Sequence, residues 1–180
     1  MSQFEYLAVF LSIIFGISVT HILAGAVRSI YRKRADETHI VMTAFFFLVL
    51  ILNWWVGFKW HDHLNWSFGQ FLIIILWAVT HYIAAITLYP PQTSGASQPL
   101  EFRRNWFLWA FAISASMDIV LTWARGELFT PPVYLPFVGH YIVLSLVAIA
   151  VNKAAFHRWM AWYFLIVMLT WSFVVRRFLE

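Results

Sequence analysis

Three histidines stand at near-constant spacing along the sequence, each inside a hydrophobic segment. His21, His81 and His140 each follow a valine by two positions, as in Val-Thr-His at the first two and Val-Gly-His at the third. Imidazole titrates close to physiological pH and also binds metal ions. The pattern therefore indicates either proton transfer or ligand binding within apolar surroundings.

Asp118 is the remaining ionisable residue deep in an apolar segment. It belongs to a stripe in which Ala110, Ser114, Asp118 and Thr122 recur at helical i, i+4 spacing. A stripe of small and polar side chains faces protein or water, and not lipid. Two interpretations follow: a close-packed helix interface in which Asp118 is hydrogen-bonded, or a site for an ion or proton.

The histidines allow several arrangements. One metal ion shared by His21, His81 and His140 needs all three at one depth, and counting from the ends of their segments places them at different depths. Axial ligation of haem b by His21 and His81 across a pair of helices is a second arrangement. The third is a staggered proton relay that also uses Asp118 and Asn53. Buried, neutral histidines that fix helix contacts are the structural alternative.

The composition defines the class of protein that must position these groups. Hydrophobic residues make up 62% of the chain and charged residues only 11%, against about one quarter charged in ordinary soluble domains. We therefore expect an integral membrane protein. The chain has no cysteine, which excludes disulfides, iron–sulfur clusters and thiol nucleophiles. Gly-rich phosphate loops, His-Glu-x-x-His and Gly-x-Ser-x-Gly are also missing, which favours a protein that is not an enzyme. An enzyme acting on lipid stays open as an alternative, although the sequence shows no set of catalytic residues for it.

The apolar runs predict an all-α, polytopic fold of six transmembrane helices in one domain over residues 1–180. Each run is about the length that a bilayer requires. The predicted helices cover about 6–27, 40–58, 68–89, 106–124, 133–151 and 159–175.

A possible internal repeat divides these helices into three tandem hairpins. The first helix of each pair carries one of the three histidines, and the second carries Leu-Asn-Trp or Leu-Thr-Trp. These triplets begin at Leu52, Leu121 and Leu169. Repeats of this kind are common in transport proteins, where sites form at the repeat interface.

Basic residues predict the orientation. The connections after the first, third and fifth helices are the more basic, so we expect them in the cytoplasm and both termini on the extracytoplasmic side. We expect the following residues to lie at the lipid interface: Arg28, Arg32, Lys33, Arg34, Arg103 and Arg104. We therefore attribute the net charge of +4 to basic residues that contact the headgroups of the lipid bilayer. No nucleic-acid partner is expected.

These features predict a proton or cation channel or transporter subunit. Its pathway would contain His21, His81, Asp118 and His140, with Asn53 and Ser114 as polar support. A chain of 180 residues leaves little room for an internal pathway, so we expect a homo-oligomer or a subunit of a membrane complex. No cofactor is expected. The alternatives are a haem b or metal redox protein, and a structural or sensing subunit.

Overall fold

The described part of the chain is helical, in a computed structural model that covers residues 3–32, 36–61, 66–90 and 100–175, with side chains of the last range from residue 104 onward. The helices are α1 (Gln3–Tyr31), α2 (Glu37–Gly57), α3 (Phe68–Leu88), α4 (Leu100–Ala124), α5 (Tyr134–Ala150) and α6 (Ala154–Thr170). A 3₁₀ turn, η1 (Phe58–Trp60), follows α2, and a π-helical turn, η2 (Trp171–Val175), follows α6.

The six helices overlap the predicted ranges, but α1, α2, α4 and α6 begin earlier than predicted. The apolar run marks only the part of a helix that needs a hydrophobic environment, and the helix itself continues into polar flanks. Among the described residues, five helices are long and apolar enough to cross a membrane. The sixth, α5, has 17 residues and is about 26 Å long, against a hydrocarbon core of about 30 Å.

Local sequence signals set several helix ends. Asp36 caps α2 by accepting a hydrogen bond from the backbone N–H of His39 at 3.3 Å. Ser67 and Gln70 form a capping box at the start of α3. Gly126, with a φ of +76°, follows the end of α4. The left-handed conformation there is one that glycine adopts readily, and it turns the chain toward α5.

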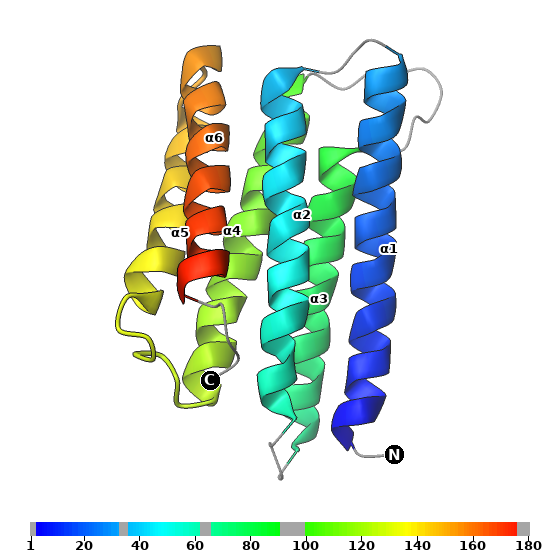
Figure 1. The fold of residues 1–180 in the computed structure, drawn as a ribbon, viewed down its shortest axis with the longest axis vertical. Helices are drawn as coiled ribbons and strands as arrows, with labels where there is room; N and C mark the ends of the chain where they lie inside the picture. The colour runs from blue at the N-terminus through cyan, green and yellow to red at the C-terminus, as the bar shows by residue number, and fades with distance from the viewer. Residues whose placement is uncertain (1–2, 33–35, 62–65, 91–99, 176–180) are drawn as a thin grey trace.

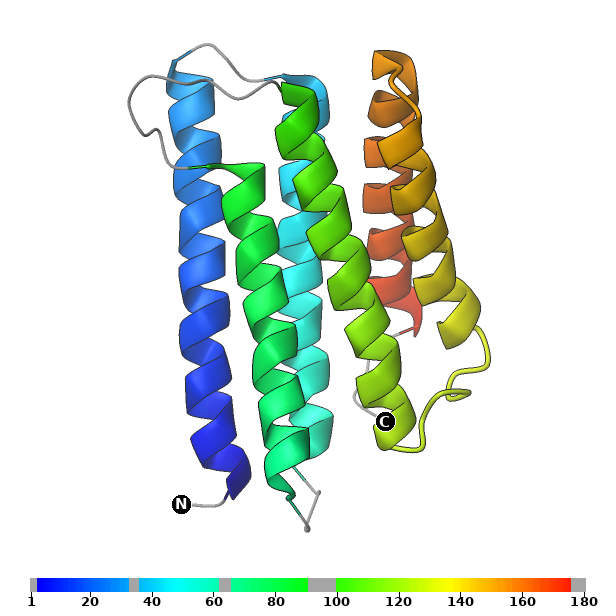
Figure 2. The same ribbon diagram turned by 180° about the vertical axis from the view of Figure 1, so that it is seen from behind.

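The six helices run alternately up and down and form a closed ring of neighbours. Seen from behind, α1, α3, α4 and α5 form a row in which each helix packs on the next (Figure 2). On the opposite side α2 packs on α1 and α6, and α6 also meets α5 (Figure 1). The order around the ring is thus α1, α3, α4, α5, α6 and α2.

This order differs from the one that three equivalent hairpins would give. A ring of such hairpins would place α2 against α3 and α6 against α1. In the observed bundle, α2 packs on α6, and α1 packs on α3. The neighbours of each helix depend on contacts between residues far apart in sequence, such as Phe45 on α2 and Phe164 on α6, and a repeated triplet of residues does not specify them.

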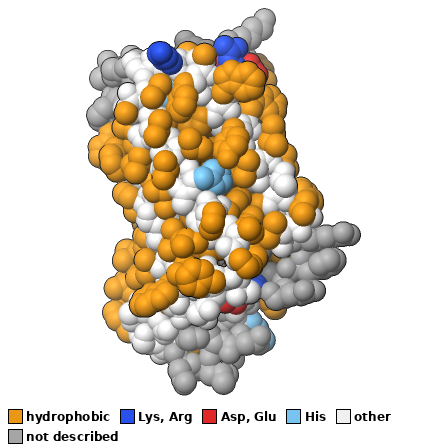
Figure 3. All heavy atoms as spheres, turned by 90° about the vertical axis from the view of Figure 1, so that its left-hand side faces the viewer, with side chains coloured by type: hydrophobic (Ala, Val, Ile, Leu, Met, Phe, Trp, Pro, Cys, Tyr) orange, Lys and Arg blue, Asp and Glu red, His pale blue; other side chains and the backbone are white. Residues whose placement is uncertain are grey.

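The bundle has two chemically different ends. We call the end where α1 begins and α6 ends the terminal end, and the opposite end, which holds Arg28, Arg32, Arg104, Lys153 and Arg158, the basic end (Figure 1). On the side formed by α5 and α6, hydrophobic side chains cover most of the surface between the ends (Figure 3). Such a surface suits lipid.

Aromatic side chains fill the centre of the bundle. The rings of Phe45 and Phe46 on α2 and Phe164 on α6 are fully buried. Phe45 lies with its ring centroid 5.3 Å from that of Phe111 on α4 and 5.5 Å from that of Tyr141 on α5. This core joins four helices and leaves a cavity beside it, toward the terminal end.

Candidate functional site

A cavity of about 70 Å³ lies inside the bundle, bounded by residues from α2 to α6 and by Trp171. Asn53, His81, Ser114 and Asp118 all line it. These four residues come from three different helices and belong to the pathway that the sequence predicts. We call this space the polar cavity.

His81 lies fully inside the bundle, with 2% of its surface exposed. Its Nδ1 lies 2.9 Å from the carbonyl oxygen of Trp77. Because a carbonyl only accepts, Nδ1 must carry the proton and donate it. Nε2 lies 2.8 Å from the Asn53 amide nitrogen and then accepts from that amide. These two bonds define a neutral imidazole with a single tautomer.

Asp118 lies on the face of α4 that is turned to the cavity. The hydroxyl of Tyr134, at the start of α5, donates to its Oδ2 at 2.7 Å. One turn earlier on α4, Ser114 is buried and donates to the carbonyl oxygen of Phe111 at 2.8 Å. The stripe of small and polar residues on α4 therefore faces protein and the cavity, as predicted.

Further polar side chains that line the cavity were not among the predicted pathway residues. They are Thr122, Arg125, Tyr134 and Tyr141. Thr122 belongs to the predicted α4 stripe, and Arg125 follows it by one helical turn, which was the available signal. No local pattern marks Tyr134 or Tyr141, because α5 is brought to α4 only by tertiary packing.

The comparisons with known proteins give no further guide. No protein-family model, curated protein or solved structure matches this chain. The function must therefore be argued from the cavity itself.

His21 lies away from the polar cavity, nearer the basic end. Its Nε2 donates to the carbonyl oxygen of Tyr89 at 2.7 Å. The Tyr89 hydroxyl is hydrogen-bonded to Thr43 Oγ1 at 2.9 Å, and its ring packs 4.5 Å from that of His39. We call His21, His39, Thr43 and Tyr89 the Tyr89 cluster. Along α3 it lies about 12 Å from His81.

His140 on α5 is in aromatic surroundings. Its ring lies 4.0 Å from that of Tyr141 and 5.7 Å from that of Tyr163 on α6. Within the described residues, neither His140 nor His21 lines the polar cavity. The structure thus brings together His81, Asp118, Asn53 and Ser114, and leaves the other two histidines in separate places.

The geometry of the histidines bears on the metal and haem interpretations. In the part of the chain that is described, no group of three or more His, Cys, Asp or Glu could hold a metal ion. Axial ligation of haem by His21 and His81 would require the bonds of both Nε2 atoms, to Tyr89 and to Asn53, to be broken. We therefore derive no chemistry through either group.

The predicted lipid-interface residues are partly visible. Arg28 and Arg32 are exposed near the end of α1, and Arg104 is half-buried near the start of α4. All three lie at the basic end. Lys33, Arg34 and the side chain of Arg103 lie outside the described residues.

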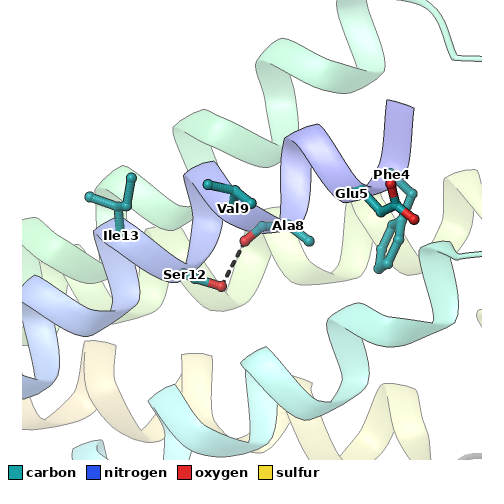
Figure 4. A pocket seen from close by; sticks show the side chains of 6 residues that line it. All are labelled: Phe4, Glu5, Ala8, Val9, Ser12 and Ile13. Atoms are coloured by element: carbon teal, nitrogen blue, oxygen red, sulfur yellow. Dashed lines mark hydrogen bonds between the residues drawn. The ribbon is translucent and has the colours of Figure 1, made fainter. Parts of the chain in front are cut away.

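A second hollow, of about 520 Å³, lies along the outer side of α1 (Figure 4). Its lining residues, from Phe4 to Ile13, all belong to this one helix. Ser12 donates to the carbonyl oxygen of Ala8 at 2.7 Å and accepts from the indole N–H of Trp54 at 3.1 Å. The polar groups here are already paired with protein, so this hollow is a shallow surface feature and not a reaction site.

Proposed function

We propose that this chain is an integral membrane protein that takes up a proton or small cation into the polar cavity, as a transporter or as a subunit of one. The observation that carries the proposal is the convergence of Asp118, His81, Asn53 and Ser114 on one internal cavity. Ionisable groups at membrane depth are costly, and those that face a common cavity mark ion or proton pathways.

Asp118 is the group that we propose binds the ion. A carboxylate accepts a proton or ligates a cation. When no ion is bound, the Tyr134 hydroxyl, 2.7 Å away, donates a hydrogen bond to the charged Asp118 carboxylate. Hydrogen bonds to charged acceptors contribute about 1.5–3 kcal/mol. Tyr134 therefore stabilises the empty, charged site against the cost of burial.

We propose that His81 and Asn53 form the next proton-accepting position after Asp118, deeper in the bundle. In the observed state the Asn53 amide donates to Nε2 of neutral His81. If His81 takes up a second proton at Nε2, rotation of the Asn53 amide by a half turn presents its oxygen as the acceptor. The same pair of side chains thus satisfies both protonation states of the imidazole.

The region beyond His81 favours a gated transporter over an open pore. Rings of Phe15, Trp77 and Phe46 surround the imidazole at centroid distances of 5.7, 4.9 and 6.3 Å. Phe46 lies on α2 between Asn53 of the polar cavity and Thr43 of the Tyr89 cluster, and its buried ring separates the two sites along this helix. Passage to the basic end therefore needs a change in side-chain or helix position.

The proposal also includes an orientation of the helices in the bilayer and an oligomeric assembly. All six helices would span the bilayer, with the basic end in the cytoplasm according to the positive-inside rule and both termini on the other side. The polar cavity would then load from the extracytoplasmic side. We propose that the chain works as a homo-oligomer or within a larger membrane complex, because one small bundle offers a narrow internal space.

Flux measurements in proteoliposomes test the proposal. Purified protein would be reconstituted, and proton, Na⁺ and K⁺ gradients imposed separately with matching indicator dyes. We expect one of these ions to move faster than in protein-free vesicles, and Asp118→Asn to abolish the difference. Wild-type vesicles with no flux of any of the three ions would refute the proposed function.

A further inference from the structure

The Tyr89 cluster joins three helices toward the basic end of the bundle. Tyr89 follows the last residue of α3, and its side chain is buried. His21 on α1 donates from Nε2 to the Tyr89 carbonyl oxygen at 2.7 Å. Thr43 on α2 is hydrogen-bonded to the Tyr89 hydroxyl at 2.9 Å. One residue therefore ties the end of α3 to both α1 and α2.

The direction of the bond between Thr43 and Tyr89 follows from the hydrogens that are available. Thr43 Oγ1 donates its only hydrogen to the carbonyl oxygen of His39 at 2.7 Å. The Tyr89 hydroxyl must then donate to Thr43 Oγ1. The hydroxyl at position 43 is thus the acceptor that holds the Tyr89 side chain on α2. Valine at this position would keep the shape of threonine and remove the acceptor.

The backbone allows the Tyr89 side chain to move without unwinding α3. Tyr89 has a φ of −130° and a ψ of 73°, which lie outside the helical region, so the helix ends at Leu88. Gly25 on α1 faces the Tyr89 ring, and a Cβ at Gly25 would overlap it. Because Gly25 contributes no side chain, the ring fills the space between α1 and α3 at this level. Displacement of the ring would open that space.

We propose that Tyr89 is the gate that controls passage between the polar cavity and the basic end. Phe46 divides the two sites along α2, and the Tyr89 cluster lies beyond it on the side of the basic end. In the observed state the bond to Thr43 holds the gate closed. Opening breaks this bond and turns the ring away from Gly25. The inference rests on the proposed function, because it names the residue that regulates ion passage along the same pathway.

Thiol labelling of the purified full-length protein tests whether Tyr89 opens. The chain has no cysteine, and Ala85→Cys places a single thiol at a fully buried position one turn before Tyr89 on α3. We expect a small water-soluble thiol reagent to label this position slowly. Adding Thr43→Val should speed the labelling about three- to tenfold, which corresponds to the net contribution of one hydrogen bond. Adding Tyr89→Phe, which removes the donor of the same bond, should have the same effect.

Control variants separate the opening of Tyr89 from a general loosening of the bundle. Thr43→Ser keeps the hydroxyl and should leave the labelling of Ala85→Cys slow. Thr87→Val removes a hydroxyl that donates within α3, to the Ala84 carbonyl oxygen at 2.9 Å, and should also leave it slow. A thiol from Ala161→Cys, fully buried in the core, should react equally slowly with and without Thr43→Val. No acceleration at position 85, or an equal acceleration at position 161, would overturn the inference.

Ion flux in proteoliposomes shows whether this opening controls passage. Thr43→Val should raise the initial rate by a factor similar to that of the labelling, and Thr87→Val should keep the wild-type rate. Faster labelling with unchanged flux would show a loosened helix end instead of a gate, and would also overturn the inference. Absence of flux from wild-type vesicles refutes the proposed function. Wild-type flux that Thr43→Val does not change refutes the gate alone, so the two failures are distinguishable.

Discussion

Asn53 on α2 and His81 on α3 are joined by a 2.8 Å hydrogen bond between the amide nitrogen and Nε2. With the bond from Nδ1 to the Trp77 carbonyl oxygen, this leaves the imidazole with both nitrogens satisfied. The two side chains also form part of the wall of the polar cavity.

Replacing Asn53 by leucine should destabilise the fold. Nε2 of His81 would be left as a buried acceptor without a donor, which costs about 1–3 kcal/mol. The double variant Asn53→Leu, His81→Leu should recover part of that loss, since both polar partners are then gone. Thermal unfolding in detergent of the single and double variants measures the effect. A double variant whose loss is the sum of the two single losses would show that the bond is energetically unimportant.

Gly25→Ala should weaken the contact between α1 and the end of α3. An added Cβ at Gly25 would overlap the Tyr89 ring, 2.7 Å from the Cβ of that residue. Overpacking of this kind costs about 1–3 kcal/mol. The control is Gly16→Ala on the same helix, where nothing lies within 4 Å.

The control variant should be neutral or more stable by up to about 1 kcal/mol, because alanine is the better helix former. Melting temperatures of the two variants in the same detergent make the comparison. Equal stabilities for Gly25→Ala and Gly16→Ala would contradict the close packing of Tyr89 on α1.

A cysteine placed in the polar cavity should react with a small water-soluble thiol reagent. The chain has no cysteine of its own, so Ala115→Cys, which lines the cavity, would carry the single thiol. Ala161→Cys is the control, because Ala161 is fully buried in the core. Mass spectrometry after timed labelling gives both rates. If position 115 reacts no faster than position 161, the cavity is closed to water.

Tyr134→Phe should impair the proposed ion site without changing its shape. The variant removes the hydroxyl that donates to Asp118, a bond to a charged acceptor with a contribution of about 1.5–3 kcal/mol. We expect slower flux and a lower melting temperature. Tyr163→Phe, on the half-exposed side of α6, serves as the control, and the same reduction in both variants would argue against a specific role for Tyr134.

The sequence predicted the helices well because their signal is local. Apolar runs and flanking basic residues place all six, and i, i+4 spacing on α4 correctly turns Ser114, Asp118 and Thr122 to one side. Asn53 and His81 could be named as polar residues in apolar segments, but their mutual bond could not, since it depends on how α2 and α3 are placed in the bundle.

The neighbours of each helix could not be predicted from repeated triplets. Buried contacts such as that of Phe45 with Phe164, whose ring centroids lie 5.1 Å apart, bring α2 against α6 and join residues far apart in sequence. For the same reason the sequence did not show that Tyr134 meets Asp118. His21 and His140 share a sequence pattern with His81, yet they lie in different surroundings.

The initial rate of ion entry into proteoliposomes, compared between Asp118→Asn and Glu37→Gln, tests the central claim most directly. Both substitutions remove one carboxylate. Glu37 lies at the basic end, where it accepts from the indole N–H of Trp162 at 3.0 Å, outside the polar cavity. We predict that Asp118→Asn reduces the rate to that of protein-free vesicles and that Glu37→Gln keeps the wild-type rate. Wild-type flux through the Asp118→Asn protein would contradict the proposed ion site.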